Sequence, residues 1–418
     1  MTATYDLFSA QRPGMRFDDQ QPMVDMDRLR SYRLARTQAA LRASGCDAAV
    51  LTNPIYIRYA TGVSSAQVYM MHLPERTAIV TADGPAAIFD DYVPELLRPG
   101  NNVVDLWRPT IGFTEYRCGA RATESARAWA GEVAAVVAQR TGQKKPRLAI
   151  DAPGFYAHEA LREAGFALES AEPVMTAAHR IKSPDEVACL SHAVTVAETG
   201  MWRIREGLRP GVTENELLAL LHAENIAAGG EWGEYKLLLS GPRTFPWVQE
   251  SSHRIVRGGE LVAMDTGLIG PMGYGADISR TFYCPPGRPD ARQRELYRVA
   301  LECLEHNLAL FRAGRRFSEV AGEAFELPAR FKEHRYGCIA HGIGMGDENP
   351  VVVWREGYAA GEPDDTLEAG MVLAVESYVA ADDSIEGVKL EDQIVVTEDG
   401  CRRLSTFPFE RELFDIPG

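Results

Sequence analysis

The chain of 418 residues lacks any long hydrophobic run. Its longest apolar stretches, such as residues 217–221 and 371–375, fall far short of the roughly 20 residues that a membrane-spanning helix needs. Residues 1–24 are polar where a secretory signal would carry an apolar segment, and they read as an irregular arm. We therefore expect no membrane association and a cytoplasmic location.

Disulfide chemistry and excess positive charge are also missing. The seven cysteines are scattered, odd in number and without a Cys-x-x-Cys motif, which fits reduced thiols better than disulfides or a thiolate zinc site. Lys and Arg total 44 against 59 Asp and Glu, which gives a net charge of −15. Such an acidic chain is a poor candidate for binding nucleic acid or an anionic membrane.

The first part of the chain has the pattern of a mixed α/β domain, to which we assign residues 1–175. Helical periodicity is found over residues 27–44, with Gly45 as its C-cap, and over residues 122–140. Asp83-Gly84 separates two short apolar runs and predicts a hairpin. The expected strands of this domain are residues 48–52, 77–81, 86–89 and 147–151.

The second part, residues 176–418, has the pattern of an α+β domain. Ser183-Pro184-Asp185-Glu186 predicts a helix start with a capping box, and Thr213-Glu214-Asn215-Glu216 predicts another. The helices and strands fall in separate runs, which indicates an antiparallel sheet. The expected long helix is 289–313, and the expected strands are 236–239, 261–268, 277–283, 371–376 and 388–397.

Two pairs of carboxylates lie at hairpin spacing in this second part. Asp265 and Asp277 flank a turn-rich stretch centred on residue 271, and a hairpin there places them opposite each other on one face. Glu376 and Glu391 flank the polar turn 381–384 in the same way. Like charges opposite each other destabilise a sheet, and burying them without a cation is costly.

A bound divalent metal explains both pairs more economically than two unrelated coincidences. His341, in the glycine-rich run 341–344, is a plausible nitrogen ligand. Four carboxylates and one histidine suit Mn, Fe, Co or Zn. The alternative is that these aspartates are ordinary turn or cap residues at strand ends, which spacing alone does not exclude.

These residues and their neighbours resemble the pita-bread metallopeptidase and creatinase superfamily. The resemblance rests on Asp265-Thr266-Gly267, on residues 277–282, on His341-Gly342-Ile343-Gly344, on Glu376 and on residues 389–392. It implies a pita-bread C-terminal domain, a creatinase/prolidase-like N-terminal domain and two divalent metal ions. Asp277 and Glu391 would bridge the ions, Asp265 would serve one ion, and His341 and Glu376 the other.

The chain departs from the proline-specific peptidases of that superfamily at two helper positions. Those peptidases carry a histidine soon after a Ser-Gly and a second one in His-Gly-x-Gly-His. Here residues 240–250 contain no histidine, and Met345 stands at the second position. Loss of both groups argues against peptidase activity because they assist the tetrahedral intermediate and proton transfer.

A narrower resemblance points to the DddP-type dimethylsulfoniopropionate lyases. It rests on residues 222–226, 229–232, 240–244, 246–247, 389–393 and 406–409, and on an Asp-to-Asp spacing one residue longer than in the peptidases. It places a proton-abstracting base at Asp347 and a tyrosine at Tyr336. Those lyases have Asp-x-Asp at the first ligand, whereas this chain has Gly267 there.

The resemblance implies a C–S lyase that releases dimethyl sulfide and acrylate from a small-molecule substrate, with iron as the favoured metal. A sulfonium head needs aromatic surface for a cation–π contact. Candidate substrate-binding residues are Trp247, Trp232, Tyr69 and Arg243. The resemblance also implies a homodimer, in which the N-terminal domain helps to wall off the partner's active site.

Two further functions stay open. One is a dinuclear metallo-hydrolase of C–N bonds, such as an Xaa-Pro peptidase or a compatible-solute amidase, which Gly267 favours. The other is a non-catalytic binding protein, against which the complete five-residue ligand set argues.

Overall fold

The computed structural model describes residues 24–93 and 95–417, in two compact units. One unit is Asp25–Arg180 and the other begins at Ile181. The arm expected over residues 1–24 lies almost wholly outside the described residues. No helix of the described chain is long and apolar enough to cross a membrane.

The Asp25–Arg180 unit contains a mixed six-stranded sheet, as the sequence predicts. Its strand order is β4-β3-β2-β1-β5-β6, with antiparallel pairs β1/β2 and β2/β3 and parallel pairs elsewhere. Gly84 has φ +79° in the turn between β2 and β3, which confirms the hairpin. The strands are β1 Ala48–Leu51, β2 Thr77–Thr81, β3 Ala86–Phe89, β4 Val104–Arg108, β5 Arg147–Ile150 and β6 Ala167–Ser170.

Local signals fix the helices of this unit. Asp25 caps the first helix by accepting from the backbone N–H groups of Asp27 and Arg28, and Gly45 ends it in the left-handed conformation. Trp129 and Val133 of α6 are fully buried in the core of the unit. The helices are α2 Met26–Ser44, α3 Pro54–Thr61, α4 Gln67–His72, α5 Glu115–Cys118, α6 Ala122–Thr141, α7 Phe155–Glu163 and α8 Glu172–His179.

The unit that begins at Ile181 is built on two antiparallel sheets and a small hairpin. The strand order is β11-β8-β7 in one sheet and β13-β12-β14-β15-β16 in the other, and β9 pairs with β10. The strands are β7 Leu238–Ser240, β8 Leu261–Asp265, β9 Leu268–Ile269, β10 Gly275–Ala276, β11 Ser279–Tyr283, β12 Ala340–Ile343, β13 Asp347–Val352, β14 Val372–Val379, β15 Val388–Val396 and β16 Cys401–Arg403.

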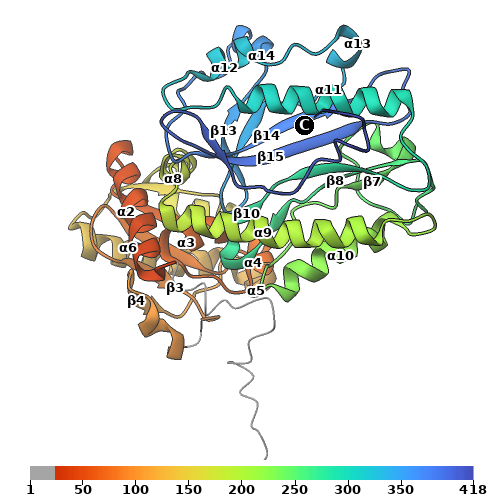
Figure 1. Ribbon diagram of the computed structural model, residues 1–418. Helices are drawn as coiled ribbons and strands as arrows, with labels where there is room; N and C mark the ends of the chain where they lie inside the picture. The colour runs from red at the N-terminus through yellow and green to blue at the C-terminus, as the bar shows by residue number, and fades with distance from the viewer. Residues whose placement is uncertain (1–23, 94, 418) are drawn as a thin grey trace, which may run out of the picture. The chain divides into compact units, whose positions relative to one another are not determined.

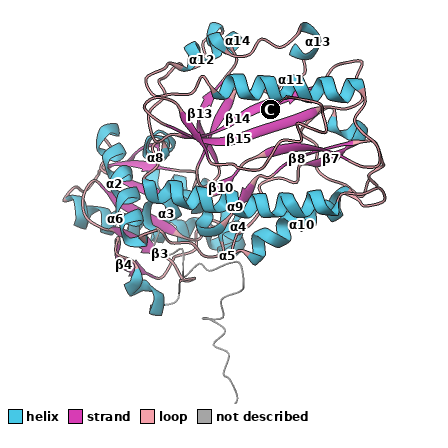
Figure 2. Ribbon diagram, in the orientation of Figure 1, coloured by secondary structure: helices cyan, strands magenta, loops and turns pink. Residues whose placement is uncertain are grey.

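The helices of this unit lie on both sides of its strands (Figure 1). Both predicted capping boxes are present, at Ser183/Glu186 and Thr213/Glu216. The long helix is shorter than predicted, because it begins after the Asp290 cap and ends at Leu308. The helices are α9 Pro184–Gly207, α10 Glu214–Ala227, α11 Ala291–Leu308, α12 Phe317–Glu323, α13 Ala329–Lys332 and α14 Arg355–Ala359 (Figure 2).

The two sheets meet where β11 lies beside β15. The Thr281 hydroxyl donates to the Lys389 carbonyl at 2.9 Å, and the Arg280 guanidinium donates to the Glu391 carbonyl at 2.7 Å. Arg280 also pairs with the buried Asp392 at 2.8 Å. These contacts hold the polar residues of β11 and β15 next to each other, beneath the apolar packing of α11 on β14 and β15.

Candidate metal centre and active site

Glu376 and Glu391 lie directly opposite each other on β14 and β15. The ladder between these strands runs without interruption from Val372↔Val395 to Val379↔Val388, and Glu376↔Glu391 is one of its pairs. Both side chains are almost completely buried. The predicted opposition of these two glutamates is therefore confirmed, and it places two carboxylates at one point inside the protein.

Asp265 and Asp277 share a face but are not opposite each other, so that part of the prediction is wrong. Asp265 pairs with Ser279, and the β9/β10 hairpin continues with Ile269↔Gly275. The turn is thus centred on Met272, which has φ +60°, rather than on residue 271. Asp277 is the diagonal neighbour of Asp265, a distance at which side chains still interact.

The structure brings all five predicted metal ligands together. One group of mutually close ligand atoms comes from Asp265, Asp277 and Glu391, and another from His341, Glu376 and Glu391. The Nε2 atom of His341 lies 3.4 Å from Asp277 Oδ2 and 3.5 Å from Glu376 Oε1. Two adjacent three-residue sets that share Glu391 are an arrangement that could hold a pair of metal ions.

Lys389 adds a cation to this cluster that the sequence argument did not assign. Its fully buried ammonium lies 3.2 Å from Asp265, 2.7 Å from Glu376 and 2.8 Å from Glu391. The Ser279 hydroxyl accepts from the same ammonium at 2.7 Å and donates to Glu391 Oε2 at 2.6 Å. Lys389 precedes Glu391 by two residues, and strand periodicity therefore places both on one face.

One lysine does not balance four buried carboxylates. Burial raises the pKa of Asp277 well above its usual range, and the charges of Glu391 and Asp265 raise it further. Burial and the charge of Asp265 raise the pKa of Glu391 in the same way. The buried Oε1 atom of Glu391 has no hydrogen-bond donor among the described residues. These are the two residues that the resemblance assigns as bridging ligands, and both need additional positive charge, so the donor set fits divalent cations.

Asp347 lies beside His341, and Tyr336 lies beside the buried Lys389. Asp347 begins β13, opposite Ile343 of β12, and its Oδ1 atom lies 3.9 Å from His341 Nδ1. About half of the Asp347 side chain is exposed, at 52%. The ring of Tyr336 lies 4.8 Å from the Lys389 ammonium. The charge of Glu376, followed by burial, raises the pKa of the Tyr336 hydroxyl, which therefore keeps its proton.

Glu234 is a second carboxylate beside Asp347, and the sequence argument missed it. Removal of water by the surrounding protein, followed by the charge of Asp347, raises the pKa of Glu234 to about 7. The backbone N–H of Asp347 donates to it. Burial, more than any neighbouring charge, raises the pKa of Asp347 as well. Both carboxyl groups therefore hold their protons more tightly than exposed carboxyl groups do.

The four predicted substrate-binding residues differ in their burial and in their neighbours. Trp247 is buried next to the cluster, with its ring 5.8 Å from the Lys389 ammonium. Trp232 is partly buried in the segment that precedes Tyr235. The Arg243 guanidinium is engaged by Glu214, by Ser252 at 2.9 Å and by the Glu250 carbonyl at 2.6 Å.

Tyr69 lies in the other unit, on α4. Its ring is 6.1 Å from that of Tyr92 and 6.2 Å from that of His72. Its role with substrate stays a prediction.

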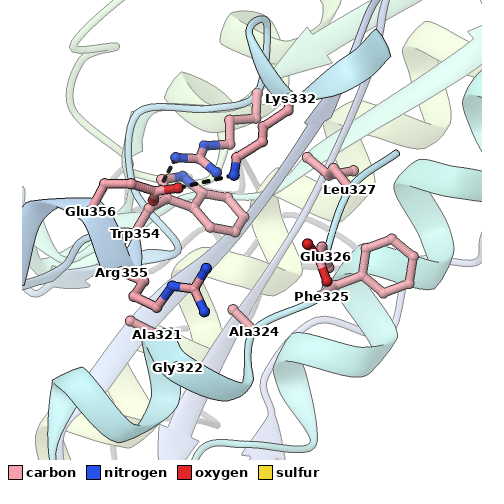
Figure 3. A pocket seen from close by; sticks show the side chains of 11 residues that line it. Ala321, Gly322, Ala324, Phe325, Glu326, Leu327, Lys332, Trp354, Arg355 and Glu356 are labelled. Carbon is pink, nitrogen blue, oxygen red and sulfur yellow. Dashed lines mark hydrogen bonds and ion pairs between the residues drawn. The ribbon is translucent and has the colours of Figure 1, made fainter. Parts of the chain in front are cut away.

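A separate cavity of about 70 Å³ opens beside α12 and α14 (Figure 3). Glu356 pairs with two of the cations that line the cavity, Lys332 at 3.1 Å and Arg335 at 2.9 Å. The indole of Trp354, on the cavity wall, donates to the Tyr336 carbonyl at 2.7 Å. The cavity wall is therefore joined to the backbone of Tyr336 by one hydrogen bond.

Comparison with known families agrees with this geometry. Residues 188–398 match the model of metallopeptidase family M24, and residues 33–177 match the creatinase/prolidase N-terminal domain. The chain therefore belongs to metallopeptidase family M24, with a creatinase-type N-terminal domain and a pita-bread C-terminal domain.

Among its relatives, the chain is similar to two lyases over nearly its whole length. It is 34% identical over 396 residues to the dimethylsulfoniopropionate lyase DddP of Roseovarius nubinhibens, which covers 94% of this chain and 89% of that protein. Identity to the corresponding lyase of Roseobacter denitrificans is 33% over 399 residues, with the same coverage. The Xaa-Pro aminopeptidase of Escherichia coli is 30% identical, but the match covers 56% of this chain and 58% of that one.

Solved structures show the same fold in peptidases. The Xaa-Pro dipeptidase from Bacillus anthracis superposes with a TM-score of 0.73 at 22% identity, covering 91% of this chain and 99% of that one. A prolidase from Pyrococcus horikoshii gives a TM-score of 0.68 at 21% identity, covering 90% and 99%. At these identities the likeness establishes the architecture alone.

Proposed function

We propose that this protein is a metal-dependent lyase that cleaves dimethylsulfoniopropionate, or a related β-substituted acid, to dimethyl sulfide and acrylate. The observation that carries the proposal is the placement of Asp347 within 3.9 Å of His341 and of the Tyr336 ring 4.8 Å from the Lys389 ammonium, next to the buried carboxylates. The similarity to lyases over 94% of the chain supports it. Met345 and the histidine-free stretch 240–250 leave the site without the helper groups of a peptidase.

Asp265, Asp277, His341, Glu376 and Glu391 would hold two divalent ions, which supply Lewis acidity toward the substrate carboxylate when bound. Iron is our first choice, with Mn, Zn or Co as alternatives, because carboxylate and imidazole donors suit all four. The protein supplies the remaining chemistry through side chains that surround this cluster.

Asp347 acts as the base. Its carboxylate takes the proton from the carbon next to the substrate carboxylate, and that electron pair forms the Cα–Cβ double bond of acrylate. The Cβ–S bond breaks at the same time, and its electron pair leaves with neutral dimethyl sulfide, which needs little acid assistance. Burial raises the pKa of Asp347, which makes its carboxylate a better base near neutral pH.

Tyr336 and Trp247 position the substrate. The protonated Tyr336 hydroxyl can donate a hydrogen bond to the substrate. The rings of Tyr336 and Trp247 already interact with one cation, the ammonium of Lys389. Aromatic faces of this kind suit a sulfonium group.

The test is headspace detection of dimethyl sulfide from purified protein loaded with Fe, Mn or Zn and given dimethylsulfoniopropionate. We expect the Asp347→Asn variant to lose about 10²–10⁴-fold in rate while keeping its metal, the range typical of a lost general base. Asp382→Asn, which changes an exposed carboxylate that pairs with His334, is the matched control and should behave as wild type.

Release of no dimethyl sulfide with any metal, from protein shown to hold two ions, contradicts the lyase. Cleavage of Xaa-Pro peptides or hydrolysis of compatible-solute amides would then support the metallo-hydrolase, which Gly267 and the partial similarity to the Xaa-Pro aminopeptidase of Escherichia coli favour.

We also propose that the protein works as a homodimer in the cytoplasm. All seven cysteines are free, which suits a reducing compartment. Sedimentation of the purified protein tests the dimer, which a monomeric mass would contradict.

A further inference from the structure

Gly267 lies two residues after Asp265, where no side chain fits. Its φ is +43°, in the left-handed region that favours glycine. A Cβ atom at this position would lie 2.3 Å from Cε2 and 2.5 Å from Cζ of Tyr235. Non-bonded carbon atoms prefer about 3.5–4.0 Å, so such an atom would overlap the ring. The ring of Tyr235 fills the space that a side chain at position 267 would need.

Backbone hydrogen bonds hold Tyr235 opposite Gly267. The Glu234 N–H donates to the Gly267 carbonyl at 2.8 Å, and the Asp265 N–H donates to the Leu237 carbonyl at 2.9 Å. An isolated bridge also joins Gly233 to Leu268. Tyr235 lies between these contacts on its own segment, which fixes its backbone against the start of the β9/β10 hairpin.

The Tyr235 hydroxyl reaches the metal ligands. It donates to Asp277 Oδ1 at 2.7 Å and lies 3.4 Å from Asp265 Oδ1. The second oxygen of Asp277, Oδ2, faces His341 Nε2 at 3.4 Å. Tyr235 therefore fixes one oxygen of Asp277 and leaves the other directed at the histidine ligand.

We propose that Tyr235 is a positioning residue of the metal centre and that it forms a reciprocal pair with Gly267. The tyrosine can orient Asp277 only while position 267 carries no side chain, and a side chain at 267 requires the ring of Tyr235 to leave. This inference rests on the proposed metal centre but not on the identity of the substrate.

The first test measures Mn²⁺ affinity by calorimetry, without substrate. Groups that orient metal ligands contribute about 10–100-fold to affinity, and we expect Tyr235→Phe to lose that much. Tyr297→Phe is the matched control, because it removes another buried tyrosine hydroxyl of this unit. Tyr297 lies on α11, and its hydroxyl accepts from the Glu410 N–H of the C-terminal segment. This control variant should bind Mn²⁺ as wild type does. Wild-type affinity in Tyr235→Phe overturns the proposal.

The second test uses the reciprocity itself. Gly267→Asp should lose Mn²⁺ affinity and lower the melting temperature, because the new side chain meets the Tyr235 ring. In a Tyr235→Ala background, Gly267→Asp should cause little further loss of Mn²⁺ affinity and a smaller drop in melting temperature, because the ring that it meets is gone. Gly314→Asp is the matched control, since Gly314 has φ +83° and no atom within 4 Å of its Cβ position. It carries the same backbone strain without the collision, and it should keep its Mn²⁺.

The proposal is wrong if Gly267→Asp binds Mn²⁺ as wild type does while Tyr235 is present. It is equally wrong if Gly267→Asp lowers Mn²⁺ affinity by the same factor in the Tyr235→Ala background as in the wild type. Wild-type protein that binds Mn²⁺ but releases no dimethyl sulfide contradicts the lyase and leaves this pair intact, so the two failures can be told apart.

Discussion

The two strand pairs that carry the carboxylates are built differently. β14 and β15 form an uninterrupted antiparallel ladder in which Glu376 faces Glu391. β8 and β11 stop at Asp265↔Ser279, and the chain continues into the separate β9/β10 hairpin. The regular pair brings two carboxylates face to face. The interrupted pair offsets Asp265 from Asp277 and opens the position opposite Asp277, where Gly267 and Tyr235 meet.

The difference shows what each pair contributes. The regular ladder supplies fixed negative charge, because both glutamates are held by a continuous backbone network. In the interrupted ladder, the carboxylate of Asp277 is oriented instead by Tyr235, a residue from a distant segment of the chain. Lys389 spans both, with contacts to Asp265 on one side and to Glu376 and Glu391 on the other.

Removing a charge from the regular pair should have the largest effect. Glu391→Gln removes a carboxylate shared by both groups of ligand atoms, and we expect activity to fall on the order of 10³-fold, as the loss of several kcal/mol of metal-assisted stabilisation implies. Elemental analysis should show a matching loss of metal.

Glu386→Gln provides the control for this variant. Glu386 is a buried glutamate on the same β14–β15 connection that accepts from the Leu261 N–H instead of facing the cluster. Full metal content in the Glu391→Gln protein would show that Glu391 is not a metal ligand.

Replacing Lys389, which contacts carboxylates of both strand pairs, should destabilise the metal-free protein more than the metal-loaded protein. Breaking a buried ion pair costs about 3–5 kcal/mol, and we expect Lys389→Met to lose that much in the free energy of unfolding without metal. Bound divalent ions should offset much of this loss. Urea unfolding with a chelator and with Mn²⁺ measures both, and equal destabilisation in the two conditions would contradict this role of Lys389.

Ser279, rather than Asp277, is the cross-strand partner of Asp265, and substitution of Ser279 tests its role beside the cluster. Its hydroxyl joins Lys389 to Glu391, and a lost buried hydrogen bond to a charged group costs about 1–3 kcal/mol. We expect Ser279→Ala to weaken Mn²⁺ affinity and metal-free stability together. Thr281→Val on the same strand loses bonds to the Lys389 backbone instead, and should reduce stability while leaving Mn²⁺ affinity intact. Equal Mn²⁺ affinities in these two variants would contradict a role of the Ser279 hydroxyl in metal binding.

The smallest effect concerns Glu234, which lies beside the interrupted pair. Its pKa is raised to about 7, so between its ordinary value of 4.5 and 7 the folded state binds more protons than the unfolded state. Stability of the metal-free protein therefore falls as pH rises through this range. Glu234→Gln should remove that contribution: its melting temperature relative to wild type should rise from pH 5 to pH 8. A constant difference across this range would show that Glu234 titrates normally.

Local rules were sufficient for the regular elements. The capping boxes at Ser183 and Thr213, the turn at Gly84 and the facing of Glu376 and Glu391 all follow from short-range spacing, and the structure confirms them. The Asp265–Asp277 register failed because residues 270–274 form a turn centred one position later than assumed, which moves the cross-strand partner by two residues.

Tertiary placement decided the rest of the site. Tyr235 lies 30 positions before Asp265 in the chain, and Glu234 more than 100 before Asp347, so no periodicity connects them. The sequence makes Arg243 a candidate substrate-binding residue, yet the structure engages its guanidinium with the buried Glu214.

The sequence by itself determined the family and the five candidate metal ligands through short motifs that resemble that family. The two-part organisation and the facing of Glu376 and Glu391 followed from local patterns of periodicity and hairpin spacing. Only the tertiary structure decided how those ligands are oriented and balanced. The contact of the Tyr235 ring with Gly267 and the position of the Lys389 ammonium among the carboxylates both depend on segments that meet only after folding. Burial then removes water, so that each charge must be stabilised by neighbouring protein groups.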